Sequence, residues 1–129
     1  MHVSGPSTER HTTFVPPVVI ARVDQLRAGV GRPVRVRFWD YAVWLLEDGT
    51  VRVIDGTCGH IGGPLAGGAV QDGCVTCPWH GWAYDLATGE RATALGPAPG
   101  VRAYLAWVKD GDVWADLPAD PLERDPGPA

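Results

Sequence analysis

Two pairs of metal-binding side chains lie in the middle of the chain, separated by residues 61–76. The first pair belongs to Cys58-Gly59-His60 and the second to Cys77-Pro78-Trp79-His80. Thiolate and imidazole are both common metal ligands, and two of each are enough to hold a metal centre. Gly59 and Pro78 are poor helix formers, so both pairs are expected to lie in loops. Two short loops of this kind could hold one centre from two sides.

Three explanations of this pattern can be compared. Chance is disfavoured, because two of the three cysteines and two of the four histidines fall into it. A structural zinc site also uses two Cys and two His, but it usually pairs like with like at wider spacings. A 2Fe–2S cluster with two Cys on one iron and two His on the other needs the same four ligands. The residues therefore predict a metal centre, and the mixed pairs favour the cluster over zinc.

The elements that must position these loops are expected to be short strands separated by turns, as in an all-β sandwich or barrel. Pro16-Pro17 predicts an edge position for the first strand, and Asp24–Gly29 resembles one capped helical turn. Asp48-Gly49 and Asp110-Gly111 are strong hairpin signals. Asp72-Gly73 and Thr88-Gly89 mark further turns, and residues 59–68 form a loop with five glycines. The expected strands are 15–23, 33–38 (with Val34, Val36 and Phe38 on the buried side), 41–47, 50–54, 104–109 and 112–117.

Length and composition indicate one globular domain. The chain has 129 residues, 45% of them hydrophobic, and a net charge of -4 without a basic block. Clustered Lys and Arg are what nucleic acids and anionic membranes select, so neither is an expected partner. The longest apolar run, residues 42–46, is too short to span a membrane, and the cytoplasm is the expected compartment. We expect residues 1–13 and 118–129 to be tails around a domain at 14–117.

Some candidate residues have simple structural explanations. Cys74 is expected to be a small buried apolar side chain. Packing is expected for Trp39, Trp44, Trp107 and Trp114, and a solvated strand end for Asp110, Asp112 and Asp116.

The two cysteine–histidine segments resemble the cluster-binding boxes of Rieske ferredoxins. The similar residues are 58–65 (CGHIGGPL) and 77–90 (CPWHGWAYDLATGE), and the strand pattern extends the resemblance over residues 14–117. The resemblance implies an antiparallel β-sandwich with a small cluster-binding subdomain made of two loops. It also implies one 2Fe–2S cluster per chain, with Cys58 and Cys77 on the buried iron and His60 and His80 on the outer iron.

The same resemblance implies roles for residues around the cluster. Tyr84 matches a tyrosine that faces the cluster, and Pro97 lies in a proline segment, residues 95–100, that covers it. Rieske proteins of respiratory complexes have an additional disulfide, but Gly63 and Trp79 stand at those positions here. They also have a cluster-facing serine where this chain has Trp82. These departures point to the soluble, low-potential branch of the family. Trp79 and Trp82 are expected in the cluster environment, and Trp82, beside a ligand loop, is expected to face a partner or to shield the cluster.

The implied function is one-electron transfer without catalysis by the chain itself. The family implies a flavin-dependent ferredoxin reductase upstream and a terminal oxygenase downstream. The alternative is the Rieske domain or small subunit of a larger oxidoreductase, either an oxygenase component or a subunit similar to the small subunit of nitrite reductases. A free-standing oxygenase needs a second iron with two His and a carboxylate. The two histidines left after the four ligands, His2 and His11, both lie in the expected N-terminal tail, so a free-standing oxygenase is excluded.

Overall fold

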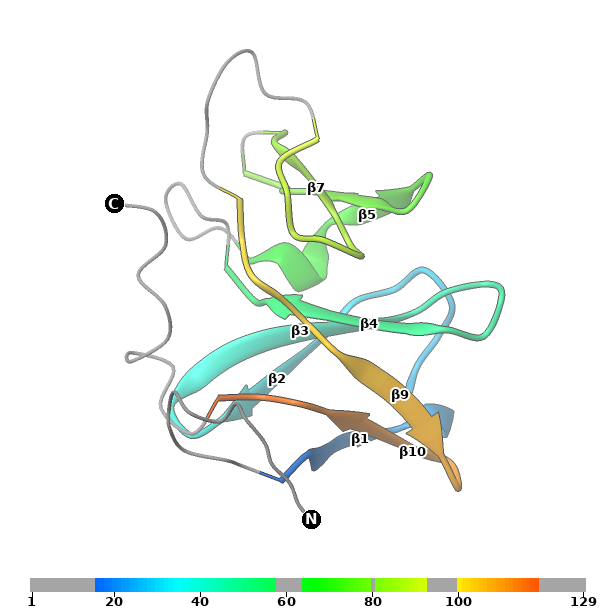
Figure 1. Cartoon of the computed structure of the whole chain (residues 1–129). Helices are drawn as coiled ribbons and strands as arrows, with labels where there is room; N and C mark the ends of the chain where they lie inside the picture. Colours follow the sequence, from blue (N-terminus) through cyan, green and yellow to red (C-terminus); the bar gives the residue numbers. More distant parts are fainter. Residues whose placement is uncertain (1–15, 58–63, 80, 93–99, 119–129) are drawn as a thin grey trace.

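The computed structural model describes residues 16–57, 64–79, 81–92 and 100–118, and these residues form three antiparallel sheets (Figure 1). The first sheet has the order β1-β10-β9, the second β2-β3-β4-β8 and the third β5-β6-β7. The strands are β1 (Val18–Arg22), β2 (Arg32–Val36), β3 (Trp39–Leu45), β4 (Val51–Asp55), β5 (Ala69–Gln71), β6 (Cys74–Thr76), β7 (Ala83–Asp85), β8 (Ala103–Tyr104), β9 (Ala106–Lys109) and β10 (Asp112–Ala115). Two short 3-10 helices, η2 (Val23–Gln25) and η3 (Leu65–Gly67), complete the described elements. The predicted all-β class is confirmed.

The β3–β4 sheet is the central layer, because both of its faces are buried. Four consecutive residues of β3, from Tyr41 to Trp44, are almost fully buried. Alternate side chains of a strand point to opposite faces. Tyr41 and Val43 accordingly pack into a core with β1 and β10, whereas Ala42 and Trp44 pack into a second core with β6 and β7. The second core therefore joins the sandwich to the small third sheet, which lies above it in Figure 1.

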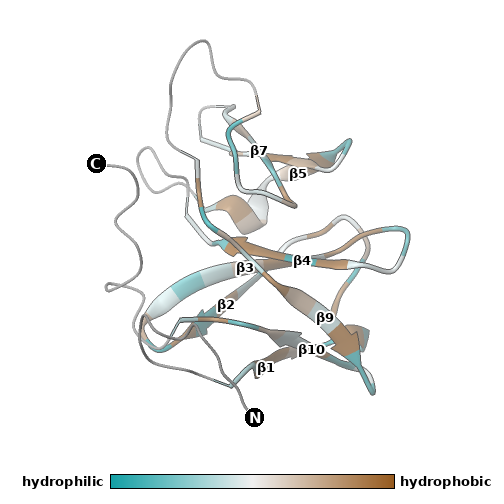
Figure 2. Ribbon diagram, in the orientation of Figure 1, coloured by the Kyte–Doolittle hydropathy of each residue, from teal (hydrophilic) through white to brown (hydrophobic). Residues whose placement is uncertain are grey.

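The Asp-Gly signals correctly locate the hairpin turns. Asp110 and Gly111 both have positive φ, 55° and 80°, and so do Asp72 and Gly73, 55° and 78°. Two consecutive residues with positive φ match the twist of antiparallel strands, and Asp and Gly adopt this conformation more easily than other residues. In the β3–β4 turn, Asp48 accepts hydrogen bonds from the amide and the hydroxyl of Thr50. Figure 2 shows hydrophilic residues at the tips after β3 and β9 and apolar segments along the strands.

The strand predicted at 104–109 is divided in the structure. Tyr104 in β8 pairs with Val53 of β4, whereas Ala106 in β9 pairs with Ala115 of β10. Leu105 lies between the two strands and its residue surface is 69% exposed. The chain thus leaves one sheet of the sandwich and enters the other at this residue.

Two other local predictions are wrong. Phe38 does not continue the buried side of a strand: it has φ 70° and is 88% exposed in the turn after β2. The helical turn expected at Asp24–Gly29 is a 3-10 turn that ends at Gln25, because Leu26 is already extended. Within this turn, the Gln25 side chain accepts a hydrogen bond from the Arg22 amide. The first strand has the predicted edge position, but β1 begins only at Val18.

Candidate metal centre

The second ligand segment is a tight loop between β6 and β7. The Cys77 amide donates to the Trp82 carbonyl at 2.7 Å, and the Gly81 amide donates to the Cys77 carbonyl at 3.0 Å. Gly81 has φ 75°, which suits glycine at this bend. Cys77 is 1% exposed, whereas Trp79 at the loop tip is 61% exposed. The loop therefore holds a buried sulfur at its base and an exposed aromatic ring at its tip; His80 lies outside the described residues.

The first ligand segment leaves the end of β4 and returns beside it. Cys58 and His60 lie outside the described residues, but the residues on either side of 58–63 are in contact. Thr57 and Pro64 form an antiparallel bridge, and the Leu65 amide donates to the Gly56 carbonyl at 2.9 Å. This loop is therefore anchored at both of its ends.

Close packing connects the return of the first loop to the start of the second. Gly68 follows η3, and a Cβ at this position would overlap the Thr76 carbonyl oxygen. Only glycine permits such an approach. Leu65, Val75 and Cys77 share one buried core. The residue before Cys77 therefore contacts the chain that has just completed the first loop.

The residues predicted to surround a cluster lie in different environments. Tyr84 is fully buried in the same core as Cys77, and Trp82 packs against this core. Pro97 lies outside the described residues. The structure adds one residue that the sequence does not indicate, Arg91, whose guanidinium carbon lies 3.1 Å from the centroid of the Trp82 ring. Arg91 reaches this place because residues 90–92 fold back on β7, with a bridge between Tyr84 and Arg91.

Cys74 is expected to be a small buried apolar side chain, but in the structure it is only half-buried. Val75 is the residue of β6 that enters the core. Partial burial raises the pKa of the Cys74 thiol above its ordinary value of 9.0, and the negative charges of Asp85 and Asp72 raise it further. A neutral thiol is a poor metal ligand and a poor nucleophile.

The expectations for the aspartates and tryptophans can also be compared with the structure. Asp112 is not merely a solvated strand end, because it accepts a hydrogen bond from Arg22 at 2.8 Å. Asp110 and Asp116 are exposed as expected. Trp44 is a core residue, and Trp39 is half-buried with its indole nitrogen donating to Asp55.

The described residues include one of the four predicted ligands, Cys77. Those residues contain no group of three or more His, Cys, Asp or Glu side chains that could hold a metal ion. Three of the four predicted ligands lie outside them. The fourth, Cys77, is a buried free thiol beneath an exposed loop tip. A buried sulfur beneath an exposed tip suits a cluster with one inner iron and one iron near solvent.

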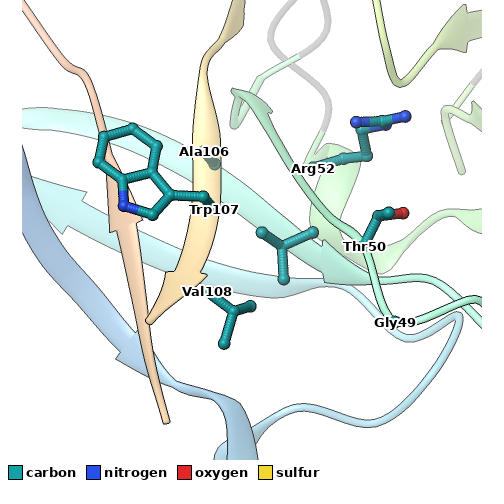
Figure 3. Close-up of a pocket in the computed structure, with 7 residues that line it drawn as sticks. Gly49, Thr50, Arg52, Ala106, Trp107 and Val108 are labelled. Atoms are coloured by element: carbon teal, nitrogen blue, oxygen red, sulfur yellow. The ribbon is translucent and has the colours of Figure 1, made fainter. Parts of the chain in front are cut away.

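A hollow of about 270 Å³ lies elsewhere, between the start of β4 and β9. Figure 3 shows Thr50, Arg52 and Val108 around it, with the Trp107 ring directed to one side. Its lining residues are Gly49, Thr50, Val51, Arg52, Ala106, Trp107 and Val108. None of them is a Cys or a His, and the first ligand loop leaves the opposite end of β4. The hollow is therefore not part of the candidate centre.

No helix in the described part of the chain is long and apolar enough to cross a membrane.

The fold is similar to that of known ferredoxins, and part of the sequence is similar to that of a desaturase. The ferredoxin of carbazole 1,9a-dioxygenase from Nocardioides aromaticivorans IC177 is 30% identical, with a TM-score of 0.70 over 78% of this chain and 97% of that one. The Sphingomonas yanoikuyae B1 ferredoxin is 27% identical, with a TM-score of 0.71 over 80% of this chain and all of that one. Cholesterol 7-desaturase nvd of Bombyx mori is 31% identical over 101 residues, which are 74% of this chain and 22% of that protein.

The chain spans less than a third of the length of the curated relatives that it matches. The model of the Rieske [2Fe-2S] domain family, in contrast, matches residues 16–105, which include both cysteine–histidine segments. The chain belongs to the Rieske [2Fe-2S] domain family, and this domain implies one 2Fe–2S cluster.

Proposed function

We propose that the protein is a one-electron carrier whose cluster is held by Cys58 and Cys77 on one iron and by His60 and His80 on the other. The observation that carries the proposal is the nearly complete coverage of two stand-alone ferredoxins, 97% and 100% of their chains. The matches to oxygenases and desaturases cover only a small part of those enzymes. Ferredoxins are electron carriers, which supports electron transfer as the function of this chain.

The cluster, when bound, supplies reversible one-electron chemistry. The contribution of this chain is the charge and the placement of its ligands. Two thiolates and two neutral imidazoles carry two fewer negative charges than four thiolates, so reduction is easier than in a four-cysteine cluster. Burial of Cys77 places one ligand in an apolar core, and the exposed Trp79 shows that the tip of the same loop reaches the surface.

Alanine variants of the four proposed ligands test this assignment, with Cys74→Ala as the matched control. The wild-type protein should show visible absorption and, when reduced, an EPR signal with an average g value below 2. Each ligand variant should lose native iron and sulfide content, because one iron loses one of its two protein ligands. Cys74→Ala should keep both. Native iron and sulfide in all four ligand variants would overturn the assignment, and a colourless wild type with bound zinc would establish the zinc alternative.

For the partners, we propose a flavin-dependent ferredoxin reductase as electron donor and a terminal oxygenase as acceptor. A solved complex of oxygenase and ferredoxin in carbazole 1,9a-dioxygenase contains a chain similar to this one, which supports an oxygenase-type acceptor. The second candidate is a component of a larger oxidoreductase, and the fold is also found in nitrite reductase small subunits and in the Rieske domain of dicamba monooxygenase.

Reconstitution with purified proteins separates these two functions. A carrier should be reduced by a ferredoxin reductase and reoxidised by an oxygenase at low micromolar concentration while remaining separate from both on gel filtration. Permanent co-elution with one large subunit would favour the second candidate. The cytoplasm remains the predicted compartment.

A further inference from the structure

The carboxylate of Asp55 accepts hydrogen bonds from three residues in two parts of the chain. The indole nitrogen of Trp39 donates to Oδ1 at 3.0 Å, and the Tyr104 hydroxyl donates to the same oxygen at 2.7 Å. The Arg102 amide donates to Oδ2 at 3.0 Å. Asp55 is half-buried, and hydrogen bonds to a charged acceptor are stronger than those between neutral groups.

The position of Asp55 makes this arrangement relevant to the candidate centre. Asp55 is the last residue of β4 and stands three residues before Cys58. Its amide donates in turn to the Arg102 carbonyl at 2.9 Å. The stem of the first ligand loop is therefore joined to residue 102 by both its backbone and its side chain.

The same short segment is also joined to the hairpin that carries the second ligand loop. The Val101 amide donates to the Gly89 carbonyl at 2.8 Å. A Cβ at Gly89 would overlap the Val101 carbonyl oxygen, so the two segments are in close contact. The Gly89 amide donates to the Asp85 backbone carbonyl at 2.7 Å, and this hydrogen bond closes the turn after β7. Residues 101 and 102 thus contact the supports of both ligand loops.

The backbone ladder does not require this carboxylate. β4 and β8 pair through Val53 with Tyr104 and Ile54 with Ala103, and these pairs need no acid at residue 55. An amide could not replace the carboxylate, because it has one acceptor oxygen for donors on two sides. Its NH₂ group would face either the Arg102 amide or the Trp39 indole, neither of which can accept.

From these contacts we propose that Asp55 is a positioning residue that fixes the first ligand loop relative to the second, through residues 101 and 102. The proposal rests on the ligand assignment given under Proposed function. Asp55 acts through the loop stems and touches no reacting atom.

The test compares Asp55→Asn with Asp40→Asn in the holoprotein. Asp40 is a matched control, because its carbonyl accepts from the Gly56 amide and it lies at the same end of the sandwich. Its side chain makes only an exposed ion pair with Arg35 at 3.2 Å among the described contacts. Both substitutions remove one negative charge from this region. Tyr104→Phe is a second test variant, since it removes one donor and keeps the ring that packs edge-on against Tyr41.

Three readouts are measured: the rate of cluster loss to a chelator, the EPR g values of the reduced protein, and hydrogen exchange of the Arg102 amide. Asp55→Asn should lose its cluster about tenfold faster than Asp40→Asn, a change in barrier of about 1.4 kcal/mol. It should also shift the g values and speed exchange at Arg102. Tyr104→Phe should lie between the control and Asp55→Asn. Loss rates and g values of Asp55→Asn equal to those of Asp40→Asn would overturn the proposal.

If Asp55→Asn does not fold, Tyr104→Phe decides the question by the same comparison, and a loss rate equal to that of the control overturns the proposal. Failure of the proposed function has a different signature, which is a wild type without iron and sulfide. In that case the exchange rate at Arg102 still decides whether the Asp55 side chain holds residues 101 and 102.

Discussion

The guanidinium carbon of Arg91 lies 3.1 Å from the centroid of the Trp82 ring, which places a cation on an indole two residues after His80. The Arg91 Nε is buried and has no hydrogen-bond partner among the described residues. The guanidinium of Arg91 thus lies against the Trp82 ring. Trp82 packs in turn against the core that contains Cys77 and Tyr84.

Loss of this stack should destabilise the protein. Arg91→Ala is expected to cost about 1 kcal/mol, within the range of cation–π interactions, and to lower the melting temperature by about 4 °C. Arg91→Lys keeps the charge but loses the planar stack, so its melting temperature should be intermediate. Arg32, an exposed residue of the edge strand β2, provides the control. Thermal unfolding of Arg91→Ala that matches Arg32→Ala would show that the stack contributes nothing.

Trp79 should be part of the surface through which partners receive or donate electrons. It is 61% exposed and lies next to His80 in the sequence. Trp79→Glu should slow reduction by a ferredoxin reductase about tenfold with little change in potential, because a new charge at an interface costs on the order of 1 kcal/mol or more. Val108→Glu is the control, since Val108 is an exposed apolar residue of β9. Stopped-flow reduction rates that are equal for the two variants would contradict this prediction.

The thiol of Cys74 should react slowly near neutral pH. Burial first, and the charges of Asp85 and Asp72 second, hold its pKa above 9.0 in the folded protein. The neutral thiol is therefore favoured by folding, and this contribution to stability is lost as the pH rises from about 9 through the folded-state value. Asp72→Asn removes one of the two charges and should lower the pKa, so that alkylation by iodoacetamide at pH 8 becomes about twofold faster.

A matched variant checks that this effect is electrostatic. Asp110→Asn makes the same change in a turn with the same backbone conformation, φ 55°, in another sheet. Mass spectrometry of the folded holoprotein should show no acceleration for Asp110→Asn. Equal acceleration in both variants would mean that the effect is not specific to the Asp72 charge and would contradict this prediction.

Local signals in the sequence were sufficient for the parts of the fold that depend on neighbouring residues. The turns at Asp48-Gly49 and Asp110-Gly111 follow from the backbone preferences of those residues. The division at Leu105 does not, because Tyr104, Ala106 and Val108 alternate as in a continuous strand. Only the separate partners of β8 and β9, in two different sheets, determine where the strand is divided.

The same distinction applies to the candidate centre. The types and spacing of the ligands are local, and so they could be read from the sequence. The contact between Arg91 and Trp82 depends on residues 90–92 folding back along β7. The contacts of Asp55 depend on Trp39 and Tyr104, which are 16 and 49 residues away in the sequence. Neither contact could be predicted from the sequence, because no motif or fixed spacing of residues indicates it.

The hydroxyl of Tyr84 should influence the reduction potential. Tyr84 is fully buried in the same core as Cys77, and the family resemblance implies that it faces the cluster. A hydrogen bond from its hydroxyl to a cysteine sulfur would favour the more negative reduced state and so raise the potential. Without the additional disulfide and the serine of the respiratory proteins, we expect a potential of roughly -150 mV.

Tyr84→Phe should therefore lower the potential. A net hydrogen bond is worth about 0.5–1.5 kcal/mol, and for one electron about 60 mV corresponds to 1.4 kcal/mol. The expected decrease is about 20–65 mV if the hydrogen bond forms only in the reduced state, and less if it forms in both states. Tyr41→Phe is the control, because Tyr41 is equally buried but belongs to the other core. Protein-film voltammetry at one pH should show a decrease for Tyr84→Phe alone. A shift below about 10 mV would identify Tyr84 as a packing residue, since even half of the weakest such bond would produce more.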